Sequence, residues 1–159
     1  MMTPSIPLCE PFLNGNERRY IEDCLATNFV SSVGAYVDRF EREFATYTGS
    51  PHAVACVNGT AAIHLALHAC GVTAGDTVLV SDFTFIATAN PVRYLGAQPI
   101  FVDSETASWN LDPARTVEAL EASARAGRLP RAVLAVQWQP TPLATRTSSP
   151  GASTTDQAA

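Results

Sequence analysis

The residues best suited to chemistry join an apolar run to the helix predicted after it, at residues 57–62, Val-Asn-Gly-Thr-Ala-Ala. Small residues at such a junction leave backbone N–H groups open at a helix N-terminus. Both the donors and the helix dipole favour an anion there. The spacing therefore indicates a phosphate site, although a tight turn in which a threonine caps the helix fits the same residues. It is not G-x-G-x-x-G, so a Rossmann dinucleotide site is not indicated.

A second group of residues follows the next apolar run, at residues 81–85, Ser-Asp-Phe-Thr-Phe. An aromatic side chain at this place can stack on a flat cofactor ring. The alternative is an ordinary aromatic residue of the hydrophobic core.

The sequence also excludes several chemistries. All 10 basic residues are arginine, so these 159 residues offer neither a Schiff-base lysine nor the lysine of a phosphate loop. No G-x-S-x-G nucleophile motif is present. His64 and His68 share one helix face, but no third ligand accompanies them, and no metal site is expected. Without a C-x-x-C pair we expect buried, reduced thiols rather than a zinc site for the cysteines, which are Cys9, Cys24, Cys56 and Cys70.

Alternating apolar runs and helical patterns must position these residues. We predict strands at residues 53–57, 77–80, 99–102 and 132–136, and helices at 17–26, 33–47, 60–70, 84–94 and 113–124. Pro91 should kink or restart the helix that contains it, and Asp112 should cap the last helix. Short apolar strands alternating with helices indicate an α/β fold with a mostly parallel sheet and helices on both faces. Such folds bind ligands at the carboxyl ends of the strands.

Composition limits the partners. With 47% hydrophobic and 16% charged residues the chain can form a packed core. A net charge of −5 gives no basic surplus for a nucleic acid, and no apolar run is long enough to span a membrane. The N-terminus has no charged region followed by a long apolar stretch, so we expect a cytoplasmic protein.

The composition changes after Val136. Of the 23 residues in 137–159, eight are serine or threonine and three are proline, and apolar periodicity is absent. We expect this segment to be disordered, either as a flexible terminus or because an ordered domain at residues 1–136 is interrupted.

Several stretches in the same order resemble the DegT/DnrJ/EryC1/StrS aminotransferases, which are sugar-modifying enzymes of fold type I that use pyridoxal 5′-phosphate (PLP). They are residues 58–67 (NGTAAIHLAL), 75–80 (GDTVLV) and 84–90 (TFIATAN). Residues 6–8, 30–41 and 101–104 are similar to the LegC-like branch, which aminates nucleotide-linked 4-keto-6-deoxy sugars for legionaminic-acid-like glycans. The resemblance covers about residues 6–136.

The resemblance implies a partial large domain of a fold type I transferase. It implies that Gly59, Thr60 and Ala61 bind the cofactor phosphate, that Phe85 stacks on the pyridine ring, and that residues 27–32 lie near the sugar or a dimer partner. The intact family implies a homodimer acting on a nucleotide sugar and an amino donor. In the fold that this sequence resembles, the strand predicted at 53–57 lies beside strands supplied late in the chain.

After Val136 the sequence departs from the family pattern, because Gln137 and Trp138 stand where the family continues with a segment like His-Leu-Tyr-Gly. The family's Schiff-base lysine and its aspartate partner of the pyridine nitrogen have no counterpart here. We therefore expect a truncated aminotransferase without activity of its own. The alternatives are a non-catalytic module that binds phosphate or PLP, a partner of a full-length subunit, and a structural remnant that binds no ligand.

Overall fold

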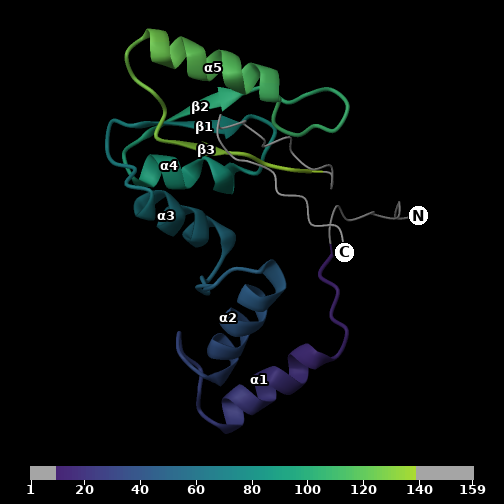
Figure 1. Ribbon diagram of the computed structural model, residues 1–159. Helices are drawn as coiled ribbons and strands as arrows, with labels where there is room; N and C mark the ends of the chain where they lie inside the picture. The colour runs from purple at the N-terminus through teal and green to yellow at the C-terminus, as the bar shows by residue number, and fades with distance from the viewer. Residues whose placement is uncertain (1–9, 139–159) are drawn as a thin grey trace, which may run out of the picture. The chain divides into compact units, whose positions relative to one another are not determined.

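A computed structural model describes residues 10–138 of the chain (Figure 1). The chain divides into two compact units, residues 1–55 and 56–159. The predicted disordered segment lies outside the described residues, apart from Gln137 and Trp138.

The first unit contains two helices, α1 (Asn16–Ala26) and α2 (Ala35–Thr48). Helix α2 ends at Gly49, whose φ of 68° lies in the left-handed region, and the next amide, of Ser50, donates to the Ala45 carbonyl (3.0 Å). This is the usual glycine-dependent end of a helix. Ala45 is the one buried residue of the two helices, so their large apolar side chains remain largely exposed.

The strand predicted at residues 53–57 does not form, and that prediction is wrong. The segment belongs to no sheet, and the Ala55 N–H donates instead to the Glu41 carboxylate (2.8 Å). Val54 and Val57 are 70% and 91% exposed. A continuous apolar run is typical of a buried strand, but a strand exists only where a neighbour completes its hydrogen bonds. Among residues 10–138 no strand pairs with this segment.

The second unit is built on a sheet of three parallel strands, β1 (Thr77–Ser81), β2 (Gln98–Val102) and β3 (Ala132–Leu134), in the order β2-β1-β3. Leu79 of β1 is in register with Ile100 on one side and Val133 on the other. The predicted parallel sheet is confirmed. Strand β3 is shorter than predicted because the chain leaves the ladder after Leu134, and the Val136 N–H donates to the Ser81 hydroxyl (3.1 Å).

Helices cover both faces of this sheet, as predicted. Helix α5 (Pro113–Arg125) lies on one face, and α3 (Gly59–Ala69) and α4 (Asn90–Tyr94) lie on the other (Figure 1). The sheet has a hydrophobic core on each face. Residues of β1 contribute to the two cores in alternation, because successive side chains of a strand point to opposite faces. Leu79 packs with Val102, Leu111 and residues of α5. The core on the other face consists of Leu67, Val72, Val78, Val80, Ala89, Val92 and Ala97.

The single helix predicted at residues 84–94 is two short pieces, a 3₁₀ turn η1 (Ile86–Thr88) and α4. Pro91 lies in the first turn of α4, where its missing N–H costs no hydrogen bond, so the proline restarts the helix as predicted. The predicted cap of α5 is confirmed, since the Asp112 carboxylate accepts from the amides of Ala114 (2.8 Å) and Arg115 (3.2 Å).

The prediction of buried cysteines is wrong for the three that the structure describes. Cys24 and Cys56 are half-buried, and Cys70 is exposed at the end of α3; all three are free thiols. Cys70 occupies the C-cap of its helix, where the chain turns at the surface. Within residues 10–138, no helix is long and apolar enough to cross a membrane.

The turn that leads into β1 is expected to make stability depend on pH. The Asp76 carboxylate accepts from the Thr73 amide (2.9 Å) and hydroxyl (3.0 Å), and these hydrogen bonds hold the pKa of Asp76 below its ordinary value. The stabilisation is therefore complete above an ordinary aspartate pKa of about 3.9 and is lost as the pH falls through the lower folded-state pKa. As the pH is lowered from 7 to 3, the urea midpoint of unfolding should fall less steeply for Asp76→Asn than for the natural chain. Parallel profiles would contradict this prediction.

Candidate functional site

The predicted phosphate-binding residues occupy the first turn of α3. Gly59 and Thr60 precede the first helical hydrogen bond, which runs from the Ala62 N–H to the Asn58 carbonyl (3.1 Å), so their amides have no carbonyl partner inside the helix. The Ala61 amide is already engaged, because it donates to the Asn58 side-chain oxygen (2.8 Å). Asn58 is therefore the cap of this helix, and the threonine cap considered above is wrong.

The space beside this turn is open. A Cβ added at Gly59 would meet no atom within 4 Å. An anion can therefore approach the helix axis where the Gly59 and Thr60 amides converge. Among the predicted phosphate ligands, these two fit such a group directly, and Ala61 would first have to release Asn58.

Phe85 lies at the start of η1 and is 73% exposed. It is not a core aromatic residue, which removes the alternative left open by the sequence. The η1 turn that follows it contacts α3, so the aromatic ring and the first predicted group belong to neighbouring elements of one unit. The Thr84 and Thr88 hydroxyls hydrogen-bond across the turn (2.7 Å) and fix its conformation.

The two histidines of α3 have different surroundings. His64 contacts the Tyr94 ring edge-on, with centroids 5.8 Å apart, and His68 lies exposed in the last turn of the helix. No group of three potential metal ligands occurs in the part of the chain that the structure describes.

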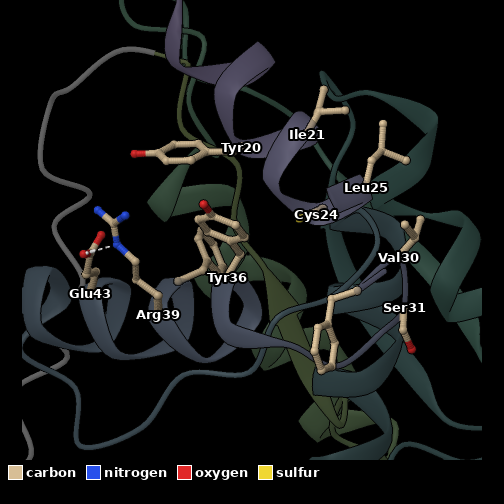
Figure 2. A pocket seen from close by; sticks show the side chains of 11 residues that line it. Tyr20, Ile21, Cys24, Leu25, Val30, Ser31, Tyr36, Arg39 and Glu43 are labelled. Carbon is tan, nitrogen blue, oxygen red and sulfur yellow. Dashed lines mark hydrogen bonds and ion pairs between the residues drawn. The ribbon is translucent and has the colours of Figure 1, made fainter. Parts of the chain in front are cut away.

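Residues 27–32, which the resemblance places near the sugar or a dimer partner, contribute to a pocket within the first unit. The pocket measures about 580 Å³ and lies between α1 and α2 (Figure 2). Leu25 and Val30 form one end, and Tyr20 and Arg39 form the other, where Arg39 pairs with Glu43 (2.7 Å). Hydrogen bonding and charge from the Arg39 guanidinium lower the pKa of Tyr20.

The sequence did not reveal an aromatic cluster at the carboxyl ends of the strands. The Phe83 ring contacts the rings of Trp109 and Trp138, with a centroid distance of 5.2 Å to each. The positions of two of these residues in the sequence could have indicated the cluster. Phe83 directly follows β1 and Trp138 closely follows β3, so both lie at the carboxyl ends of strands. The position of Trp109 could not be inferred in this way, since it lies in an irregular segment after β2.

Comparisons with known proteins agree with this fold. The family described as DegT/DnrJ/EryC1/StrS aminotransferase matches residues 11–139. GDP-perosamine synthase of Caulobacter vibrioides is 50% identical over 117 residues, which is 74% of this chain and 31% of that protein. The chain thus spans about a third of the length of this curated relative.

Solved structures give the same result. A DegT DnrJ EryC1 StrS aminotransferase from Brucella abortus has a TM-score of 0.65 at 35% identity, over 76% of this chain and 35% of that one. A GDP-4-keto-6-deoxymannose-3-dehydratase with a trapped PLP-glutamate geminal diamine has a TM-score of 0.63 at 27% identity, over 72% of this chain and 31% of that one. Because the family match covers most of the chain and the parallel sheet with its flanking helices agrees with these structures, the chain belongs to the DegT/DnrJ/EryC1/StrS aminotransferase family.

Proposed function

We propose that these 159 residues supply the phosphate-binding and ring-stacking part of the PLP site of an aminotransferase that acts on nucleotide-linked sugars. The observation that carries the proposal is the open first turn of α3, where the Gly59 and Thr60 amides have no helical partner. Family membership and the exposure of Phe85 support it.

In this proposal the Gly59 and Thr60 amides donate to phosphate oxygens, with the helix dipole adding to the attraction. Ala61 can join them only by exchanging its hydrogen bond to Asn58 for one to the phosphate. Phe85 contributes its exposed ring face to hold a pyridine ring in place. PLP, when bound, supplies the electron sink that amino transfer requires.

We further propose that these residues alone do not transfer amino groups. The chemistry of the family needs a lysine that bonds to the cofactor and moves a proton, and this sequence contains arginine as its only basic residue other than histidine. Two non-catalytic roles agree with this proposal. The chain could serve as a module that binds PLP or phosphate, or as the partner of a full-length subunit.

The substrate class in the proposal is a nucleotide-linked keto sugar. Two of the similar proteins reported above carry GDP-linked sugars in their names, GDP-perosamine and GDP-4-keto-6-deoxymannose, which supports it. The narrower prediction, a 4-keto-6-deoxy sugar destined for a legionaminic-acid-like glycan, stays a prediction. So do the homodimer and the cytoplasmic location.

PLP binding tests the site. Equilibrium dialysis of the full chain should show reversible binding that Gly59→Asp weakens by at least about tenfold, because a carboxylate then faces the phosphate at close range. The open space at Gly59 lets the fold accept the new side chain, and an aspartate in a first helical turn is itself favourable. Ala114→Asp is the matched control, since it places the same charge in the first turn of α5. Equal PLP affinities for Gly59→Asp and the natural chain would overturn the site.

Activity tests the second proposal. Incubation of the chain with PLP, glutamate and a keto-sugar nucleotide should give no amino sugar, and borohydride should fix no cofactor on an internal residue. Measurable amino transfer, or an adduct mapped to an internal residue, would contradict it.

A further inference from the structure

The carboxyl ends of β1 and β3 form a topological switch point, because the chain leaves β1 toward β2 on one side and then returns past β1 to β3 on the other side. The connection after β1 leads to α4, which packs on the face of Val78 and Val80. The connection after β2 leads to α5, which packs on the opposite face with Leu79. Open α/β sheets bind ligands outside the carboxyl ends of the strands at such a switch point.

Three large aromatic side chains gather at this place. Phe83 follows β1, Trp109 follows β2, and Trp138 follows β3. Both tryptophan rings are tilted by nearly 50° to the Phe83 ring, at centroid distances of 5.2 Å. The three side chains are 46%, 55% and 52% exposed, so about half of the aromatic cluster faces solvent rather than a core.

Hydrogen bonds hold the cluster in place. The Trp138 indole N–H donates to the Phe83 carbonyl (2.8 Å), and the Trp138 amide donates to the side-chain oxygen of the buried Asn110 (2.7 Å). Trp109 adopts a φ of 63°, a costly conformation for a bulky residue, and its amide donates to the Glu105 carbonyl (3.1 Å). The surrounding structure thus holds the exposed Trp109 in a backbone conformation that tryptophan disfavours. Such strained residues are typical of functional sites.

Two carboxylates, Asp82 and Asp103, lie at the same edge of the sheet as the aromatic cluster. Asp82 immediately precedes Phe83 and is exposed, and one of its oxygens accepts from the Ser104 hydroxyl (3.3 Å). An ionised carboxylate only accepts hydrogen bonds, so a ligand here must bring donors. The negative charges of Asp82 and of Asp103, at the end of β2, disfavour a phosphate in the same position.

We propose that this aromatic cluster binds a planar nucleic base, with guanine as the base whose donors match Asp82. Aromatic faces stack on any base, and the carboxylate adds selectivity. Guanine presents a ring N–H and an amino group side by side, which a carboxylate can accept together, whereas adenine and uracil present one such donor group each. This proposal rests on the proposed function in one respect, which is that the ligand is a nucleotide. What it adds is the identity of the base.

Tryptophan emission reports this site selectively, because Trp109 and Trp138 are the only two tryptophans of the sequence. Guanosine, added without phosphate so that α3 is not involved, should quench the emission of the full chain saturably. It should bind about tenfold more tightly than adenosine or uridine, as expected for paired hydrogen bonds to a charged acceptor. Saturation-transfer NMR on the nucleoside protons measures the same binding independently of emission.

Asp82→Asn should remove the preference for guanosine, while stacking on the aromatic rings still gives some binding of all three nucleosides. The matched control is Glu121→Gln, at an exposed acidic position on α5, which should keep the preference for guanosine. Equal binding of the three nucleosides, an unchanged preference in Asp82→Asn, or saturable quenching by a free hexose alone would each overturn the proposal. So would the absence of both quenching and saturation transfer with guanosine. PLP dialysis does not depend on these residues, so failure here leaves the proposed function standing.

Discussion

Replacing Leu79 with alanine is expected to lower the free energy of unfolding by about 2–5 kcal/mol. Leu79 is fully buried in the middle of the central strand and packs with Val102 and Leu111 beneath α5. Its removal leaves a cavity that flanking strands on both sides prevent from closing. Whole domains are stable by only about 5–15 kcal/mol, so this single change should remove a large share of the stability. Urea unfolding followed by tryptophan emission measures it, because both tryptophans lie in the unit that contains β1.

Val133→Ala is the matched control. Val133 is the register partner of Leu79 on β3, but its side chain is 43% exposed, so the same kind of truncation leaves no sealed cavity. We expect a loss of less than about 1.5 kcal/mol for the control. Equal losses for the two variants would show that Leu79 does not lie in a closed core.

The chain is also expected to associate and to bind the apolar dye ANS. The two helices of the first unit bury a single residue, and Val54 and Val57 are exposed in a segment without a strand partner. Apolar surface left in water costs roughly 25 cal/mol per Å², and large exposed patches promote association. Sedimentation velocity should therefore show species larger than a monomer, and the urea midpoint of the natural chain should be low.

The contribution of the unpaired segment can be separated. Changing Val54 and Val57 together to serine should reduce both ANS emission and association, because it removes the apolar side chains without adding charge. Val117→Ser, at a single exposed valine on α5, should change neither. A monomer with one sharp transition and a high midpoint would contradict the prediction.

The sequence by itself determined the elements whose signals are local. The apolar runs of β1 and β2, the Asp112 cap of α5 and the restart at Pro91 each depend on residues a few positions apart, and the structure has them where they were predicted. The short strands between helices also sufficed to predict a parallel sheet covered on both faces, since few other arrangements bury such strands. The resemblance in the first 136 residues identified the family, and the absence of lysine is a fact of composition.

Only the tertiary structure decided the features that depend on distant partners. Residues 53–57 have the composition of a strand, but pairing is a property of two segments, and within residues 10–138 the second segment is missing. The sequence predicts that the Ala61 amide binds phosphate, but only the structure shows that this amide donates to the Asn58 side chain. The aromatic cluster joins Phe83 to Trp138, 55 positions later, because β1 and β3 are neighbours in a sheet whose order does not follow the chain. Hydrogen-bond partners and strand neighbours are set by the three-dimensional path of the chain, which a pattern of local residue types does not encode.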